Sequence, residues 1–190
     1  MPRPPSEAAV YDLVKRLGFV TARDLASALI ERNLTLVFGG GHIGLMGVLA
    51  DAILARDCRA IGVIPQSLVD RELAHRGCEL RIVSSMHERK AVMAEVSDGF
   101  VALPGGFGTL DEMFEILTWA QLGIHTKPIG LLNVAGYFDL LLGWVGKAVQ
   151  EDFVSLTDRA LLIFDTDPER LIDRLAATRS TPKGPEAVRP

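Results

Sequence analysis

The stretches FGGGHIGLMG (residues 38–47) and LPGGFGTLDE (residues 103–112) decide how this chain folds. Each follows a short apolar run that predicts a buried strand, and each precedes a stretch with helical apolar spacing. Strands that alternate with helices in this way form parallel sheets. Further apolar runs of this kind predict a series of buried strands, at residues 34–38, 60–64, 80–83, 100–103, 129–132 and 161–164. We therefore expect an α/β fold with a doubly wound parallel sheet.

The length of 190 residues favours a single domain, which we place at residues 1–178. Apolar spacing predicts one helix over residues 9–17. Thr21 and Asp24, three residues apart, predict a capped start for a second helix that ends near Arg32. The last segment, residues 179–190, has turn and linker composition, and we expect it to be a disordered tail.

Composition excludes several classes of protein. A hydrophobic content of 48% allows a large core, and a net charge of −4 without a basic block argues against a nucleic-acid partner. The two cysteines and four histidines show no metal-ligand spacing, so we expect no metal site. The N-terminus lacks the apolar core of a signal peptide, and polar residues and glycines interrupt the most apolar region, residues 129–145. We expect a soluble, cytoplasmic protein without a membrane partner.

The first glycine-rich turn is a candidate phosphate or nucleotide loop. Gly39, Gly40 and Gly41, with Gly44, contain the pattern G-x-G-x-x-G between a strand and a helix, where exposed backbone N–H groups bind phosphate. An NAD site is not favoured, because the next strand ends in Pro-Gln (residues 65–66) instead of an acidic residue for the ribose. The alternative is that these glycines only allow tight packing of strand against helix.

The second glycine-rich turn is also suited to an anion. Gly105, Gly106 and Gly108 let the backbone approach a phosphate, and Thr109 adds a hydroxyl where the helix begins. A Walker A loop would carry a lysine beside the threonine, and none is present here. ATP hydrolysis by a P-loop mechanism is therefore disfavoured.

Charged residues follow this turn and open another predicted helix. Asp111 is explained by the helix dipole alone, whereas Glu112 and Glu115 share a helix face and could point into a cleft. Arg89 and Lys90 lie early in their helix, where positive charge opposes the dipole. This cost favours an anionic partner for them, such as a substrate phosphate or Glu112.

Two motifs together resemble one known family. SMHERK (residues 85–90) combined with PGGFGTLDE (residues 104–112) is similar to the LONELY GUY (LOG) family of cytokinin riboside 5′-monophosphate phosphoribohydrolases, many of which were once labelled lysine decarboxylases. The resemblance covers about Ala22 to Ser155. Flanking segments agree with it, namely LVFGGGHIGLMG (36–47), GVIPQSL (62–68) and TWAQLGIHTKPIGLLNVAGYFDLLL (118–142).

The resemblance implies a Rossmann-like homodimer with its active sites near the dimer interface. Its activity would be cleavage of the N-glycosidic bond of an adenine-type or cytokinin riboside 5′-monophosphate, giving a free base and ribose 5-phosphate. Arg89 and Glu112 fall on the catalytic positions, and no cofactor or metal is implied. The substrate-binding positions that the resemblance implies are Glu72, Lys90, Gly105, Gly106, Phe107, Gly108, Thr109, Leu110, Asp111 and Thr118.

The chain departs from the family at its N-terminus. Family members begin with a strand that ends in a Cys-Gly-Ser turn and helps to line the nucleotide site, and this sequence has no such turn. Either the first strand is missing, or residues 17–20 replace it in abbreviated form. The departure bears on activity and affinity more than on the fold.

Two other functions are open to such a fold. A non-catalytic carrier of a nucleotide or cofactor is one, because molybdenum-cofactor carriers resemble this chain in their glycine turns. A pyridoxal-phosphate decarboxylase is the other and would need a Schiff-base lysine, but Lys90 fits a phosphate site better. The sequence leaves open the preferred base, a role in hormone activation or nucleotide salvage, and any assembly beyond a dimer.

Overall fold

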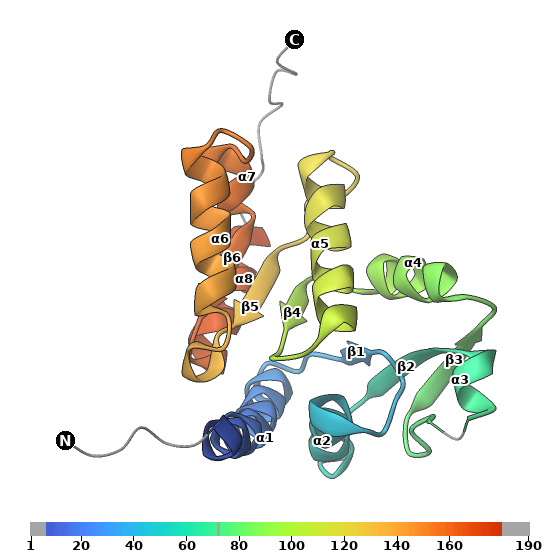
Figure 1. The fold of residues 1–190 in the computed structure, drawn as a ribbon. Coiled ribbons are helices and arrows are strands. Elements are labelled where there is room, and N and C mark those ends of the chain that lie inside the picture. Colours follow the sequence, from blue (N-terminus) through green and yellow to red (C-terminus); the bar gives the residue numbers. More distant parts are fainter. Residues whose placement is uncertain (1–6, 72, 180–190) are drawn as a thin grey trace.

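A computed structural model describes residues 7–71 and 73–179, in which helices and strands alternate (Figure 1). The strands are β1 (Leu36–Phe38), β2 (Ala60–Pro65), β3 (Glu79–Val83), β4 (Phe100–Ala102), β5 (Ile129–Leu132) and β6 (Leu162–Asp165). The α-helices are α1 (Glu7–Glu31), α2 (Gly44–Leu54), α3 (Gln66–Val69), α4 (Met86–Val96), α5 (Phe107–Gln121), α6 (Asp139–Gln150), α7 (Leu156–Ala160) and α8 (Pro168–Arg179), with a 3-10 turn at Val134–Gly136. The α/β class is confirmed, and each predicted strand is present.

The strands form two separate sheets. One has the order β1-β2-β3 and the other β4-β5-β6, and every pair within them is parallel. Leu36 is in register with Ala60, and Phe100 with Ile129. The continuous run of apolar side chains in β2 and β5, buried along their whole length, is typical of parallel strands covered on both faces. The doubly wound pattern is therefore divided, with β1 and β4 as the inner edges of its two halves.

The N-terminal region differs from the sequence-based prediction. The two helices expected over residues 9–17 and 21–32 form one continuous helix, α1, and Thr21 lies inside it. Residues 17–20 are likewise helical, so they do not replace a first strand. No proline interrupts this stretch, and Gly18 is buried beside Leu45, where packing overrides its low helix propensity. The predicted tail lies outside the described residues except for Arg179, which ends α8.

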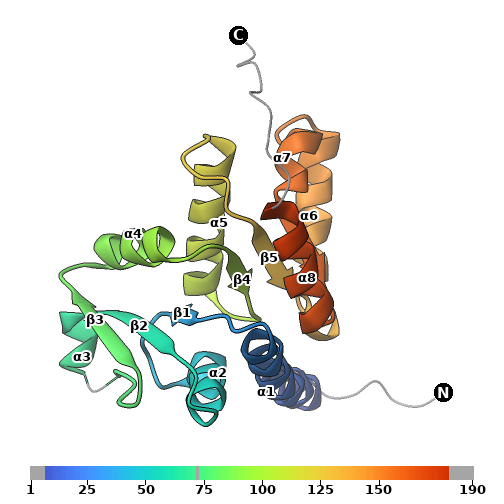
Figure 2. The same ribbon diagram turned by 180° about the vertical axis from the view of Figure 1, so that it is seen from behind.

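The structure has two apolar cores, of which the first joins the two halves. The first joins α1, α2, β1 and α8 and includes the fully buried Ile53 and Leu171. The second joins α5 to β5 and β6 around Leu131. Helix α1 lies beside both α2 and α8, as both ribbon views show (Figures 1 and 2). Arg32, directly after α1, forms an ion pair of 2.8 Å with Asp173 on α8. Among the described residues, no helix is long and apolar enough to cross a membrane.

Candidate active site

Arg89 and Glu112 form an ion pair between α4 and α5. Arg89 Nη1 donates to Glu112 Oε1 at 2.6 Å, and Arg89 Nε donates to the main-chain carbonyl of Val63 on β2 at 3.1 Å. The arginine side chain is 9% exposed and that of the glutamate 35%. A buried arginine needs such partners for its charge. The two predicted catalytic residues are therefore brought together, and Glu112 keeps one side open to solvent.

Gly39, directly after β1, makes room for this arrangement. A Cβ atom at this position would lie 1.7 Å from Arg89 Nη2, which no side chain permits. The first glycine-rich turn therefore contributes space for the guanidinium group. Gly40 has a φ of +72°, and its carbonyl accepts from His75 N–H, while Gly41 forms an isolated bridge with Ala74.

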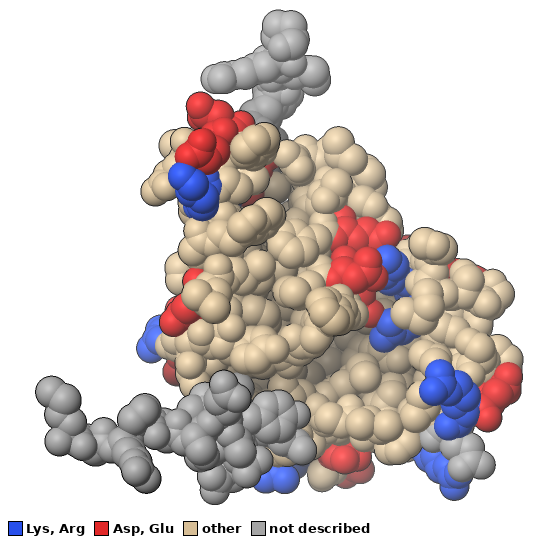
Figure 3. Space-filling model, in the orientation of Figure 1, with Lys and Arg blue, Asp and Glu red and all other residues tan. Residues whose placement is uncertain are grey.

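Lys90 is held by two carboxylates of α5. Its Nζ lies 3.1 Å from Asp111 Oδ2 and 2.9 Å from Glu115 Oε2, and its side chain is 10% exposed. Hydrogen bonds to Glu115 and then Asp111 raise the pKa of Lys90. The prediction that both early basic residues of α4 have anionic partners is confirmed. Figure 3 shows acidic and basic side chains meeting on this face of the molecule.

The N-terminus of α5 has the form of an anion site. Gly106 is the residue before the helix, and no side chain caps the first N–H groups, which follow at Phe107 to Thr109. A Cβ atom on Gly105 would lie 2.1 Å from Thr109 Oγ1, so only glycine lets this hydroxyl lie against the turn. Tyr137 fixes the turn from outside by donating its phenolic hydrogen to the Gly105 carbonyl at 2.9 Å.

The structure places the other predicted substrate-binding residues as follows. Phe107 is 94% exposed at the start of α5, and Leu110 packs against the second core. Thr118 lies further along α5, where its hydroxyl donates to the Phe114 carbonyl at 2.7 Å, and it does not line the cavity around Arg89. Glu72 lies outside the described residues.

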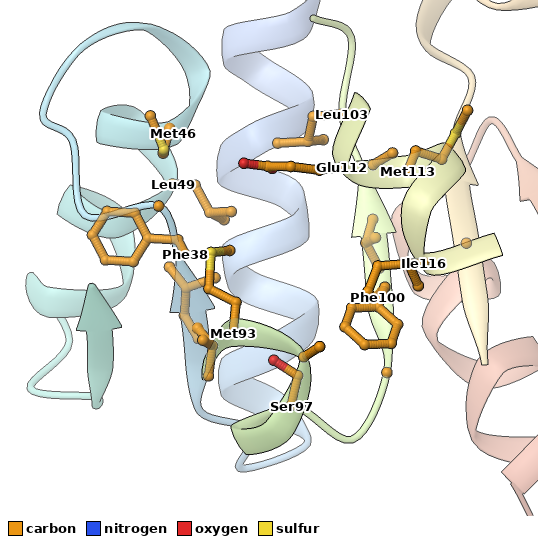
Figure 4. A pocket seen from close by; sticks show the side chains of 18 of the residues that line it. Phe38, Met46, Leu49, Met93, Ser97, Phe100, Leu103, Glu112, Met113 and Ile116 are labelled. Atoms are coloured by element: carbon orange, nitrogen blue, oxygen red, sulfur yellow. The ribbon is translucent and has the colours of Figure 1, made fainter. Parts of the chain in front are cut away.

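A cavity of about 1290 Å³ opens beside the ion pair. Gly39, Arg89, Gly105, Thr109 and Glu112 are among the residues that line it. Side chains from both halves of the molecule enter it, with Phe38, Met46 and Met93 on one side and Phe100, Leu103 and Ile116 on the other (Figure 4). In the described part of the chain, no group of three or more His, Cys, Asp or Glu side chains is placed to hold a metal.

Sequence reasoning missed two contributors to this site. The Val63 carbonyl orients Arg89, and the Tyr137 hydroxyl holds the Gly105 turn. Val63 acts through its main chain, which no residue type reveals. Tyr137 lies 32 residues from its partner, so only the tertiary fold relates the two.

Comparisons with known proteins agree with this site. The family model described as "Possible lysine decarboxylase" matches residues 46–175. Two Arabidopsis thaliana proteins, each named cytokinin riboside 5′-monophosphate phosphoribohydrolase, are 50% and 48% identical to this chain over 81% of its length, covering 72% and 73% of theirs. A protein from Oryza sativa subsp. japonica, named as a probable cytokinin riboside 5′-monophosphate phosphoribohydrolase, is also 49% identical to this chain. The match covers 81% of this chain and 74% of the relative's length.

Solved structures share the fold at lower identity. A molybdenum cofactor binding protein from Rippkaea orientalis superposes with a TM-score of 0.66 at 20% identity, over 86% of this chain and 88% of its own. The molybdenum cofactor carrier protein of Chlamydomonas reinhardtii superposes with a TM-score of 0.62 at 21% identity, over 86% of this chain and 89% of its own. Given the family model, the identity of about 50% and the paired motifs in one site, this chain belongs to the LOG family of cytokinin riboside 5′-monophosphate phosphoribohydrolases.

Proposed function

We propose that this protein hydrolyses the N-glycosidic bond of a purine riboside 5′-monophosphate, of the adenine or N6-substituted cytokinin type. The observation that carries the proposal is the Arg89–Glu112 pair beside the uncapped start of α5. The products are the free base and ribose 5-phosphate. Relatives that are about half identical to this chain are named for this reaction on cytokinin riboside 5′-monophosphates.

Glu112 is the group that suits the reacting carbon. As the bond to the base breaks, its electron pair leaves with the base, which takes up a proton, and positive charge develops on the sugar. A carboxylate next to that carbon stabilises the charge and can orient the water whose oxygen forms the new bond. Glu112 is partly open to the cavity and is held by Arg89, which keeps its carboxylate in one position.

The 5′-phosphate is assigned to the start of α5. Three successive N–H groups without side-chain caps, together with the Thr109 hydroxyl, offer hydrogen bonds to phosphate oxygens. The ammonium group of Lys90 also lines this cavity, where Asp111 and Glu115 already balance its charge. The phosphate therefore binds at one end of the ligand and places the sugar beside Glu112.

The proposal includes a homodimer in the cytoplasm. Large apolar side chains are exposed on α5 and α6, including Leu140 at 91% and Trp144 at 58%. Exposed apolar area of this kind supports a protein interface, which would lie close to the active-site helix α5. Cys58 and Cys78 are free thiols, which fits a reducing compartment.

The Glu112→Gln variant tests the reaction. Wild-type protein should release adenine and ribose 5-phosphate from adenosine monophosphate or an N6-isopentenyl analogue, measured by chromatography of both products. The variant should lose about 100-fold or more of this rate while still binding the nucleotide, because the amide cannot stabilise the developing charge. Glu151→Gln is the matched control, since Glu151 also pairs with a cation but lies at the end of α6.

Other outcomes would identify other functions. Nucleotide binding without release by wild-type protein would make it a carrier. For a decarboxylase, Lys90 would need to be neutral in order to attack an aldehyde, but its pKa is raised by two carboxylates. The geometry therefore favours hydrolysis over Schiff-base chemistry.

A further inference from the structure

One hydroxyl group holds the glycine turn that precedes α5. The phenolic oxygen of Tyr137 donates its hydrogen to the main-chain carbonyl of Gly105 at 2.9 Å. Gly105 lines the cavity beside the Arg89–Glu112 pair, whereas Tyr137 does not. The tyrosine therefore acts on this turn from outside the cavity.

The carbonyl that Tyr137 holds belongs to the peptide unit between Gly105 and Gly106. A trans peptide is planar, and its carbonyl and N–H groups point in opposite directions. The hydrogen bond to the Gly105 carbonyl therefore also fixes the Gly106 N–H, which points away from Tyr137. A donor on the carbonyl polarises the peptide unit and makes its N–H a stronger donor.

Glycine on both sides leaves this peptide plane free to rotate. Neither residue has a Cβ atom, so both have access to backbone conformations that other residues avoid. A Cβ atom on Gly106 would meet nothing within 4 Å, so its surroundings do not restrict it either. Without the Tyr137 hydroxyl, rotation of the plane would turn the Gly105 carbonyl toward the side that the N–H now faces.

The Gly106 N–H is available to a ligand. Gly106 is the residue before α5, and no side chain caps this end of the helix. In the part of the chain that the structure describes, no group accepts a hydrogen bond from the Gly106 N–H. It therefore adds to the free donors at the start of α5, where an anion binds favourably.

The turn that carries Tyr137 has a strained backbone. Ala135 has a φ of +50° and a ψ of 31°, in the left-handed region that is unfavourable for a residue with a Cβ atom. Gly136 follows with a φ of +73°. Such strain persists only where surrounding contacts maintain it, and it is concentrated at functional sites. It therefore indicates that the position of the next residue, Tyr137, matters to function.

A buried asparagine stabilises this strained turn. Asn133 accepts from the Phe138 N–H at 2.8 Å and donates to Asp139 Oδ1 at 2.7 Å. The Tyr137 N–H donates to the Val134 carbonyl at 2.9 Å. The Tyr137 ring packs edge-on against the ring of the buried Phe138, with 5.0 Å between the ring centroids. Contacts that do not involve the hydroxyl therefore fix both the backbone and the ring of Tyr137.

We propose that Tyr137 is a positioning residue of the phosphate site, which holds the Gly105–Gly106 peptide with its N–H toward the 5′-phosphate. This role rests on the proposed function, which assigns that phosphate to the start of α5. Tyr137 acts through the main chain and touches no substrate atom. Its hydroxyl raises the affinity for ligands that carry a phosphate and leaves the affinity for phosphate-free ligands unchanged.

The Tyr137→Phe variant tests this role, because it keeps the ring and removes only the hydroxyl. Titration calorimetry with ribose 5-phosphate measures the phosphate site without any turnover. The variant should bind this ligand about fivefold more weakly than the wild type, a loss typical of one neutral hydrogen bond. Its affinity for adenosine, which carries no phosphate, should equal that of the wild type.

A second readout reports on the peptide itself. In heteronuclear NMR spectra of the ligand-free protein, the Gly106 amide signal should be sharp in the wild type and broadened in Tyr137→Phe. The reason is that the released peptide plane exchanges between two orientations. An unchanged Gly106 signal in the variant would overturn the proposed role.

Thr178→Val is the matched control, since the Thr178 hydroxyl also donates to a main-chain carbonyl at 2.9 Å but lies on α8. It should bind both ligands like the wild type. Equal binding of ribose 5-phosphate by the wild type and Tyr137→Phe would overturn the role of Tyr137 and leave the proposed function intact. Equal weakening of both ligands would also overturn it, because a general loosening of the fold does not distinguish them. A wild type that binds no ribose 5-phosphate would overturn the phosphate assignment of the proposed function as well.

Discussion

At the scale of single residues, the site depends on the lack of a side chain at Gly39. Arg89 reaches both Val63 and Glu112 because no side chain at residue 39 occupies the position of its guanidinium. A glycine in a phosphate-loop pattern is commonly explained by a bound ligand. Here its role is to admit a buried arginine.

The Gly39→Ala variant should therefore displace Arg89 and disturb Glu112. We expect kcat to fall about 100-fold, since misplacement of a catalytic group by an ångström costs about that much. Steady-state assays of base release would measure this. Gly146→Ala on α6 is the control, because a Cβ there meets nothing within 4 Å, and it should raise stability by about 0.5–1 kcal/mol. Unchanged kcat in the Gly39 variant would show that Arg89 is not needed in its observed position.

At the scale of elements, Asp165 joins the end of β6 to α8. It accepts from Arg170 at 2.8 Å, from Asp167 N–H at 3.0 Å and from Arg174 at 3.3 Å. These hydrogen bonds, chiefly the one from Arg170, lower the pKa of Asp165 to about 2. The side chain is 13% exposed, so solvent screens the bonds only in part.

The lowered pKa makes stability depend on acid pH. Above the ordinary pKa of 3.8, Asp165 is ionised in both folded and unfolded states, and its full contribution to stability is present. As pH falls from about 4 to 2, the unfolded state takes up the proton first and that contribution is lost. Asp165→Asn should lower the free energy of unfolding by about 1–2 kcal/mol at pH 7. Measured by urea unfolding at a series of pH values, the free energy of unfolding of this variant should also fall less steeply at acid pH than that of the wild type.

Asp173→Asn serves as the comparison, because Asp173 pairs with Arg32 but its side chain is 65% exposed. Exposed pairs contribute little, so this change should cost below about 0.5 kcal/mol. Equal losses in the two variants would contradict the assignment of the acid dependence to Asp165.

At the scale of the whole molecule, α5 and α6 share an uncharged face. The ring of Trp144 on α6 packs edge-on against the ring of Phe114 on α5, with 5.9 Å between the ring centroids. Leu140 lies one helical turn before Trp144. Figure 3 shows few charged side chains over this part of the surface. An apolar face beside the active-site helix is where we place the dimer interface.

Leu140→Glu should separate the dimer into monomers, because it introduces a charge that the interface would bury without a partner. Analytical ultracentrifugation would measure the change in mass. Ile82→Glu on β3 is the control, since Ile82 is also an exposed apolar residue, at 53%, but belongs to the other half of the molecule. A monomeric wild-type protein, or a Leu140 variant that remains dimeric, would rule out this interface.

Much of the fold was readable from the sequence because its signals are local. The apolar runs mark every strand, and Arg89 pairs with Glu112 as their positions suggested. The pairing of Lys90 with Asp111 was not predicted, because the helix dipole alone accounted for Asp111. The continuity of α1 was not readable, since packing at Gly18 outweighs local propensity. The division of the sheet was also not readable, because pairing between distant strands leaves no local pattern.

The path of Arg89 has a mechanical consequence. Its side chain donates hydrogen bonds to the Val63 carbonyl in the first sheet and to Glu112 on α5, the helix that packs against the second sheet. Arg89 thus also connects the two halves of the molecule, in addition to its place in the catalytic pair. We expect a ligand that draws the guanidinium away from either partner to break this connection between the two halves. Faster hydrogen exchange of the α5 amides at saturating nucleotide would support this expectation. Unchanged exchange would show that Arg89 keeps both contacts when the nucleotide is bound.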